Sequence, residues 1–252
     1  MPIMKRLALA ASAAAIAASF SAANAQETLK IGTEGAYPPF NNLTADGKLV
    51  GFDVEIAEAL CEEMKVECEF VTQDWDGIIP ALQAGKFDAI VASMSITPER
   101  MEQVNFTDPY YVNSLVFIAP KDSDMDPSAV GNMVIGVQEG TIAAIFAEET
   151  YPDADLKAYP TQLEAWSDLD TGRVDAVLAD FGVQYDWINS DDGACCEFKG
   201  DPVSSDDRIG IALRKDETEL RDRFNTAIKA IRENGTYAEI NKKYFPFDIY
   251  GE

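Results

Sequence analysis

The chain of 252 residues contains no histidine, and its 20 lysines and arginines face 44 acidic residues. Histidine is the side chain that titrates near neutral pH and the commonest metal ligand, so its absence excludes histidine-based catalytic triads and histidine-bearing zinc sites. The formal net charge of −24 argues against nucleic acid and anionic lipid as partners, because both carry charge of the same sign. Salt screens exposed charges within about 10 Å, so most of these carboxylates are expected to form a solvated surface.

Long apolar runs are also absent after the first 25 residues, so no later segment has the roughly 20 uncharged apolar residues of a membrane helix. The N-terminus has the three parts of a secretory signal peptide: the cations Lys5 and Arg6, an apolar stretch over 7–20, and the sequence Ala-Asn-Ala at 23–25. The apolar stretch is too short to span a bilayer, and no cysteine follows it for lipidation. We expect export, removal of residues 1–25 as a signal peptide, and no membrane insertion.

Only four cysteines are present, in two close pairs. Cys61 and Cys68 flank a predicted helix end and strand start, a separation that a disulfide can close in an oxidising compartment. Cys195 and Cys196 are neighbours, and a bond between neighbours requires a strained peptide. The sequence leaves open whether this second pair forms that bond or remains as thiols.

Apolar runs alternate with helical patterns along the chain. The runs predict strands over 29–33, 66–72, 87–91, 133–137, 156–159 and 174–179. Helical spacing predicts helices over 53–64 and 77–84 and from 142, 162 and 217. Capping-box spacings at Thr161, Asp216 and Thr236 mark helix starts. The alternation predicts an α/β protein with largely parallel sheets, and the polar stretch 122–127 is the best candidate for a domain boundary.

Polar residues follow four of the predicted strands: Glu34, Ser93 with Ser95, Gly140 with Thr141, and Asp180. Ligands of open α/β sheets bind beyond the carboxyl ends of the strands, so these positions are candidates for one binding site. Each alone could be a turn or cap residue, but four strand ends with donors and carboxylates exceed what turns need. Tyr37 and Trp75 lie in loops after the first two strands, and Trp75 stands between two aspartates, in a segment too polar for an ordinary core.

The sequence Thr97-Pro98-Glu99-Arg100 predicts a helix start, with Thr97 as N-cap and Pro98 at the first helical position. Arg100 then lies in the first turn, where the helix dipole disfavours a cation. Such an arginine is often simply solvated. A bound carboxylate makes the placement favourable, because the guanidinium and the free backbone N–H groups can hold the same anion.

Eight segments resemble the amino-acid-binding proteins of ABC importers, in particular the lysine/arginine/ornithine and opine binders. They are TEGAYPPF (33–40), GFDVEIAEALC (51–61), QDWDGIIP (73–80), SMSITPER (93–100), GVQEGT (136–141), GRVDAVLAD (172–180), ALRKD (212–216) and GTY (235–237). The resemblance covers the whole mature chain. It implies a periplasmic-binding-protein-like type II fold, in which two α/β lobes joined by two crossing strands close on the ligand. It places lobe 1 at 26–112 and 208–252, lobe 2 at 113–207, and a disulfide between Cys61 and Cys68.

The resemblance also implies how an amino-acid head group is held. Arg100 grips the α-carboxylate, with help from Ser95 and the backbone N–H of Ile142. Asp180 and the region of Ser93 hold the α-ammonium group. The full set of implied ligand-binding positions is Glu34, Tyr37, Trp75, Ala92, Ser93, Ser95, Arg100, Gln138, Thr141, Ile142 and Asp180.

By the same resemblance, Tyr37 and Trp75 sandwich the aliphatic stem of the ligand, and Glu34 faces its distal end. Two carboxylates and one arginine give the pocket a charge of about −1, which complements a ligand of net charge +1. We therefore expect a basic amino acid, arginine, lysine or ornithine. A neutral ligand would leave Glu34 desolvated and unpaired.

Three positions depart from the pattern of the basic-amino-acid binders. Ala92 replaces a frequent serine, Gln138 an apolar residue and Ile142 a frequent threonine. Backbone contacts survive these changes and side-chain contacts do not. A polar neutral or modified amino acid is therefore the alternative ligand.

The expected role is delivery of a free amino acid to the membrane permease of an ABC importer by a monomer in the periplasm, without catalysis, cofactor or metal. One alternative is an enzyme on the same scaffold, such as a dehydratase with Glu34 or Asp180 as the acid. The chain ends at Glu252, which is expected to leave no room for a fused catalytic domain. A sensory module that reports to a membrane receptor is a further alternative, because both roles use the closed lobes.

Overall fold

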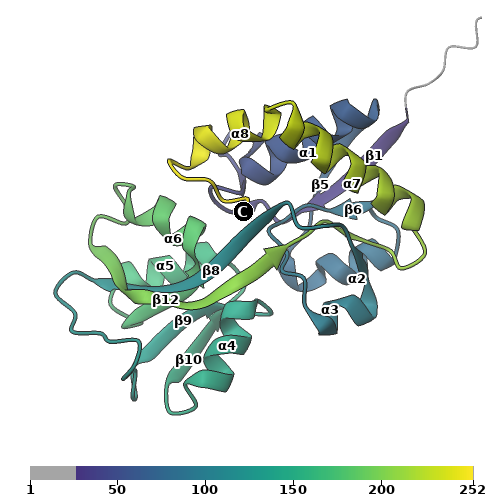
Figure 1. Ribbon diagram of the computed structural model, residues 1–252. Coiled ribbons are helices and arrows are strands. Elements are labelled where there is room, and N and C mark those ends of the chain that lie inside the picture. The colour runs from purple at the N-terminus through teal and green to yellow at the C-terminus, as the bar shows by residue number, and fades with distance from the viewer. Residues whose placement is uncertain (1–26, 252) are drawn as a thin grey trace, which may run out of the picture.

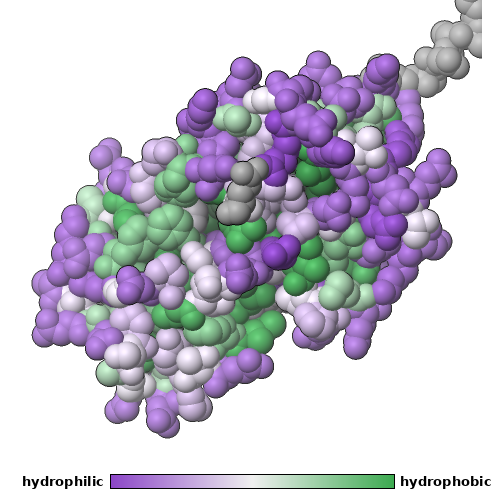
Figure 2. All heavy atoms as spheres, viewed as in Figure 1, coloured by the Kyte–Doolittle hydropathy of each residue, from purple (hydrophilic) through white to green (hydrophobic). Residues whose placement is uncertain are grey.

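The computed structural model describes residues 27–251, which form two lobes, each built on a five-stranded sheet (Figure 1). This is the two-lobed α/β architecture that the resemblance implied. The expected signal peptide at 1–25 lies outside the described residues. Between residues 27 and 251, no helix is both long and apolar enough to cross a membrane. Hydrophilic residues cover most of the outer edges of both lobes in Figure 2, as a chain with this many carboxylates predicts.

The lobe that carries the first strand is called lobe 1. Its sheet has the order β5-β1-β6-β13-β7, and β1 pairs in parallel with both β5 and β6. These strands are β1 (Thr28–Thr33), β5 (Glu67–Thr72), β6 (Ala89–Ile90), β7 (Asn105–Phe106) and β13 (Ala212–Leu213). A separate, small antiparallel sheet follows β1 in the chain and is formed by β2 (Ala36–Tyr37), β3 (Asn41–Leu43) and β4 (Leu49–Val50). The helices are α1 (Phe52–Met64), the 3-10 turn η1 (Trp75–Gly77), α2 (Ile78–Gln83), α3 (Pro98–Gln103), α7 (Thr218–Glu233) and α8 (Thr236–Tyr244).

The sheet of lobe 2 has the order β10-β9-β11-β8-β12. Its strands are β8 (Tyr111–Pro120), β9 (Val134–Gln138), β10 (Asp155–Tyr159), β11 (Ala176–Asp180) and β12 (Cys196–Ile209), and its helices are α4 (Ile142–Thr150), α5 (Gln162–Asp170) and α6 (Phe181–Ile188). The long strands β8 and β12 are antiparallel neighbours that run from lobe 2 to lobe 1 (Figure 1). Their paired ends, Tyr111 and Ile209, mark the connection between the lobes.

Phe52 lies at the start of α1 and at the centre of an aromatic cluster. It is fully buried, and its ring centroid is 5.8 Å from Phe40 and 5.9 Å from each of Tyr111, Tyr237 and Phe245. Tyr111 begins β8, Tyr237 lies in α8 and Phe245 follows it. Burial of one such ring contributes about 1.5–3 kcal/mol, and edge-to-face pairs add to this. The cluster therefore joins the first helix, the C-terminal helix and the base of a crossing strand.

Most of the predicted elements are present, with bounds shifted by a residue or two, but the parallel content was overestimated. Parallel pairing is confined to β5-β1-β6 and β10-β9-β11, and the remaining strands of both sheets pair antiparallel. The stretch 122–127 is not a domain boundary, because it joins β8 and β9, which belong to one sheet. The two-residue strands and the small β2-β3-β4 sheet have too few residues to show a period in the sequence.

The capping box at Thr161 is confirmed. The Thr161 side chain accepts from the Glu164 backbone N–H, and the Glu164 side chain accepts from the Thr161 backbone N–H. The other two predicted boxes are wrong. Glu217, not Asp216, is the N-cap of α7; it makes no side-chain cap bond, and its carboxylate accepts from Arg214 instead. Gly235 is the N-cap of α8, and its positive φ of 87° lets the chain turn sharply out of α7, so that Thr236 is already helical.

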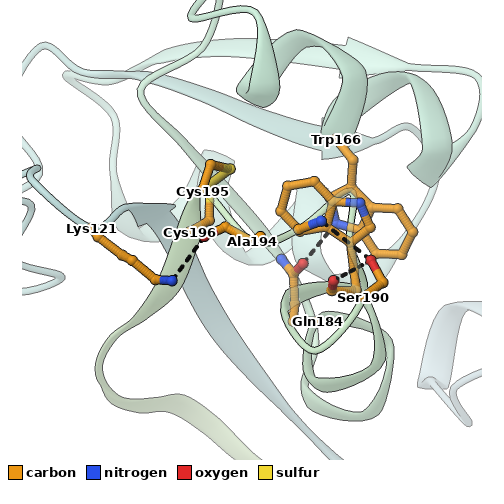
Figure 3. The surroundings of a disulfide bond; sticks show 9 residues. Lys121, Trp166, Gln184, Ser190, Ala194, Cys195 and Cys196 are labelled. Atoms are coloured by element: carbon orange, nitrogen blue, oxygen red, sulfur yellow. Dashed lines mark hydrogen bonds between the residues drawn. A yellow bond between two sulfur atoms is a disulfide. The ribbon is translucent and has the colours of Figure 1, made fainter.

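Both cysteine pairs form disulfides. Cys61 and Cys68 are bonded at 2.01 Å and tie the end of α1 to β5, as the resemblance implied. Cys195 and Cys196 are also bonded, which answers the question that the sequence left open (Figure 3). Their segment is held by Lys121, whose backbone N–H donates to Cys195 O at 3.0 Å and whose Nζ donates to Ala194 O at 2.8 Å (Figure 3).

Replacing both Cys61 and Cys68 with serine should lower the free energy of unfolding by about 2–3 kcal/mol, because the bond closes a short loop in the unfolded chain. Urea denaturation of the oxidised proteins measures the difference. The Cys195→Ser/Cys196→Ser variant is the matched control, since a bond between neighbours constrains almost no chain and should change stability far less. Equal stability of the wild type and the Cys61→Ser/Cys68→Ser variant would contradict the prediction.

Candidate functional site

A cleft lies between the lobes, and its lining consists of the same eleven positions that the resemblance implied as ligand-binding. Lobe 1 contributes Glu34 after β1 and the serines after β6, while lobe 2 contributes Gln138 at the end of β9 and Asp180 at the end of β11. These positions follow the carboxyl ends of parallel strands, where backbone N–H groups and helix starts gather. The structure therefore brings the predicted residues together, and their contact with a ligand stays a prediction.

Asp53 organises the lobe 1 side of this cleft, although it does not line it. Its fully buried carboxylate accepts from Tyr110 OH at 2.7 Å, from Asn41 Nδ2 at 3.0 Å and from Ser93 Oγ at 3.0 Å. Asn41 Oδ1 in turn accepts from Gly35 N at 2.8 Å, next to Glu34. Burial raises the pKa of Asp53 to about 6, against the lowering effect of the three hydrogen bonds. One carboxylate thus fixes two of the loops that carry cleft residues.

Sequence reasoning missed Asp53, which lies inside the resembling segment GFDVEIAEALC. The available signal was a carboxylate at the first turn of a helix, between the buried residues Phe52 and Val54. An acidic residue at that place is usually explained by the helix dipole alone. Only the tertiary structure shows that three donors from separate segments converge on it.

Arg100 lies where the sequence predicted, in the first turn of α3, and Thr97 Oγ1 accepts from its backbone N–H at 3.1 Å. Its buried guanidinium donates from Nη1 to Ser95 O at 2.9 Å and from Nη2 to Gly140 O in lobe 2 at 3.0 Å. The Trp75 ring centroid is 5.2 Å from its Cζ, within cation–π range. Burial lowers the pKa of Arg100, and Asp207 and Asp180 oppose that effect. The cation is therefore held rigidly at the seam between the lobes.

Asp180 is buried at the end of β11, and burial is the main reason that its pKa is raised to about 7. The nearby charge of Asp207 raises the pKa of Asp180 further, while hydrogen bonds from Tyr37 and Asn113 lower it. Tyr37 thus contacts the carboxylate through its hydroxyl, in addition to presenting a ring to the cleft.

Asp207 on β12 is a second residue that sequence reasoning missed. Its Oδ2 accepts from Ser95 Oγ at 3.0 Å and from Asn113 Nδ2 at 3.0 Å, so it joins lobe 1 to both crossing strands. The hydroxyl of Ser95, which the resemblance assigned to the ligand carboxylate, is thereby bonded to Asp207. No pattern singles out Asp207, because it lies in a polar stretch that becomes a strand only by pairing with β8.

Glu34 and Gln138 meet across the cleft. Gln138 Nε2 donates to Glu34 Oε1 at 2.7 Å and to Pro160 O at 3.2 Å. Burial raises the pKa of Glu34 to about 7, and the bond from Gln138 acts in the opposite direction. This bond and the Arg100 bond to Gly140 both join lobe 1 to lobe 2.

The charges of the site are asymmetric. Glu34, Asp180 and Asp207 oppose one arginine, so the fully ionised group carries −2, one charge more negative than the sequence predicted. Thr141 is the N-cap of α4, and the backbone N–H of Ile142 lies in its first turn, where it has no partner within the helix. The cleft can therefore hold an anion between Arg100 and the start of α4, and cations beside the carboxylates. Among residues 27–251, no three cysteine or acidic side chains are grouped to hold a metal ion.

The chain is similar to known proteins over nearly its whole length. Residues 29–247 match the family described as bacterial extracellular solute-binding proteins, family 3. The chain is 42% identical to the L-arginine-binding protein of Pseudomonas aeruginosa over 98% of this chain and 99% of that protein. It is 38% identical to ABC transporter arginine-binding protein 1 of Escherichia coli over 96% of this chain and 100% of that protein. Solved structures of an ancestral arginine-binding protein, bound to arginine or to glutamine, give a TM-score of 0.83 at 36% identity, covering 87% and 88% of this chain and 99% of theirs.

The Asp53→Asn variant should lose about 1–3 kcal/mol of unfolding free energy, because an amide accepts at only one of its two polar atoms and leaves a buried donor unsatisfied in either orientation. Urea denaturation at pH 7 measures the loss. Glu58→Gln, an exposed change on the same helix, is the control and should stay within about 0.5 kcal/mol of the wild type. If both variants match the wild type, Asp53 does not hold these loops.

Proposed function

The chain belongs to family 3 of the bacterial extracellular solute-binding proteins, and from that premise we propose that it is the periplasmic substrate-binding component of an ABC importer for basic amino acids. The observation that carries the proposal is one buried arginine opposed by three carboxylates around a cleft between two lobes. A basic amino acid has one carboxylate and two cationic groups, so it complements that arrangement. The relatives named above bear the names of arginine-binding proteins, which supports the same ligand class.

In this proposal Arg100 and the Ile142 N–H bind the α-carboxylate. The Ser95 carbonyl, which belongs to the same lobe as Arg100, keeps its guanidinium in place before the ligand arrives, and the bond to Gly140 forms on closure. A guanidinium held over Trp75 and a helix start with free N–H groups form an anion site that requires little rearrangement. Asp180 receives the α-ammonium group, whose charge compensates the cost of burying that carboxylate.

The distal cation of the ligand lies beside Glu34. An ionised Glu34 in this buried place is costly without a counter-charge, which its raised pKa reflects. A ligand of net charge +1 supplies that counter-charge and brings the site from −2 to −1. A neutral side chain supplies none, although the glutamine complex of the ancestral relative keeps a polar neutral amino acid as the second candidate.

Closure of the lobes completes the function. Lobe 1 comprises residues 26–112 and 208–252 and lobe 2 residues 113–207 in this proposal, with the hinge where β8 and β12 pass between the sheets. The bonds from Arg100 to Gly140 and from Gln138 to Glu34 join the lobes only when the cleft is closed. The closed monomer then presents both lobes to the membrane permease. A dehydratase would also use a carboxyl with a pKa near 7, so turnover assays with candidate substrates accompany the binding tests.

Arg100→Ala should abolish measurable binding of every amino acid, with a loss of at least about 3 kcal/mol, because a buried carboxylate would lose its charged partner. Isothermal titration calorimetry measures the loss. Arg173→Ala, which removes an exposed arginine from the other lobe, should bind as the wild type does. Near-normal affinity of the Arg100→Ala variant would show that the carboxylate is held elsewhere.

Glu34→Gln should reduce the preference for arginine over glutamine by roughly 1–3 kcal/mol, the scale of one charged hydrogen-bond partner. The preference of the wild type should also fall as the pH is lowered through about 7, because protonated Glu34 no longer attracts a cation. Asp180 titrates in the same range, but it meets the α-ammonium group of both ligands and cancels in their ratio. Competition binding between pH 5.5 and 8.5, in roughly half-unit steps around that pKa, measures both effects. If glutamine outcompetes arginine on the wild type, the proposed ligand class is wrong.

A further inference from the structure

Gln138 presents an unused hydrogen-bond acceptor at the distal end of the cleft. Its Nε2 faces two acceptors, Glu34 Oε1 at 2.7 Å and Pro160 O at 3.2 Å, which uses both of its N–H groups. Pro160 O can only accept, and so can the ionised Glu34 carboxylate, so the amide keeps its N–H₂ group toward them and its Oε1 faces another direction. Among residues 27–251, no group donates to that Oε1, although the side chain lines the cleft and is only 2% exposed.

Glu34 adds a second acceptor beside it. Gln138 occupies Oε1 of the carboxylate, and no donor in the described part of the chain reaches its Oε2. The bond between the two side chains therefore places two oxygens from opposite lobes, one charged and one neutral, at the same end of the cleft. Pro160, which follows β10, accepts a hydrogen bond from the Gln138 amide through its carbonyl, and this bond limits the rotation of the amide.

We propose that Gln138 is a specificity-determining residue that, with Glu34, selects a guanidinium group over an ammonium group, and so arginine over lysine and ornithine. This inference rests on the proposed function, because it assumes that a basic side chain reaches Glu34. It concerns only which basic group binds best.

The selection follows from how the two cations donate. A guanidinium is planar, weakly hydrated and has five N–H donors in a fixed fork, so it can bond a carboxylate and a neighbouring carbonyl at once. An ammonium group is a compact, strongly hydrated charge, and its attraction to Glu34 does not need a neutral acceptor beside it. Removing the Gln138 carbonyl should therefore weaken arginine binding more than lysine binding.

The neutrality of the amide matters as well. A second carboxylate at position 138 would attract any cation and would also repel Glu34. The amide instead donates to Glu34, favours its ionised form and offers a carbonyl oxygen in addition. Citrulline, which has the shape of arginine but a neutral urea group, lacks both the charge and one N–H₂ donor of the guanidinium, so it should bind weakly.

The experiment measures dissociation constants of arginine, lysine, ornithine, citrulline and glutamine by calorimetry on the wild type and on Gln138→Leu. The wild type should prefer arginine over lysine about tenfold or more, and Gln138→Leu should lose about tenfold of that ratio, mainly through weaker arginine binding. Gln138→Glu should also lower the ratio, because a second carboxylate attracts lysine as well as arginine. Gln83→Leu, an exposed change on α2, is the control and should keep the wild-type ratio. Thermal unfolding of each variant checks that it is folded.

An arginine-to-lysine ratio that is the same in the wild type, Gln138→Leu and Gln138→Glu would overturn the inference while leaving the proposed function intact. An equal loss for arginine, lysine and glutamine would show that Gln138 only supports the packing of the cleft, and would also overturn it. Failure of the wild type to bind any basic amino acid would overturn the proposed ligand class itself, and with it the selection by Gln138.

Discussion

The carboxylate of Asp53 is the constraint on which the lobe 1 half of the cleft depends. A buried charge is costly unless donors surround it, and here Tyr110, Asn41 and Ser93 each supply one. These donors come from the residue just before the crossing strand β8, from the small β2-β3-β4 sheet and from the loop after β6. Since Asp53 also lies in the first turn of α1, the helix dipole favours its ionised form. The position of each loop is thus tied to one point in the core.

The cleft carboxylates differ from Asp53 in that their charges are incompletely compensated. Arg100 is held by two backbone carbonyls and the Trp75 ring, which leaves three of its five N–H donors for other partners, whereas Glu34 and Asp180 both have pKa values raised to about 7 by burial. A site of this kind is stabilised by a ligand that supplies the missing positive charge, because the cost of desolvating the carboxylates has already been met by folding. The hydrogen bonds between the lobes connect the same residues, so occupancy and closure are linked through shared atoms.

Both strand pairing and side-chain contacts hold the junction between the two lobes. Antiparallel pairing between β8 and β12 has two irregularities, between Lys199 and Ser204 and between Ser204 and Asp207. Beyond the second irregularity, Asp207 accepts from Ser95 and Asn113, which connects both crossing strands to lobe 1. The aromatic cluster around Phe52 anchors the other side of the same junction. These contacts therefore leave the segments where the strands pass between the sheets as the place for the proposed hinge.

Much of this protein could be predicted from its sequence, because the deciding interactions are local. Strands β1, β9, β10 and β11, helix α1 and the Thr97 cap follow from short-range periodicity and capping, and the resemblance identified the eleven positions that line the cleft. The tertiary structure alone decided what is non-local. The antiparallel edges of both sheets depend on strand pairing between residues about a hundred positions apart. The roles of Asp53 and Asp207, and the bond from Gln138 to Glu34, depend on where separate segments meet, since a side chain acquires its partners and its pKa only when the fold has placed donors around it.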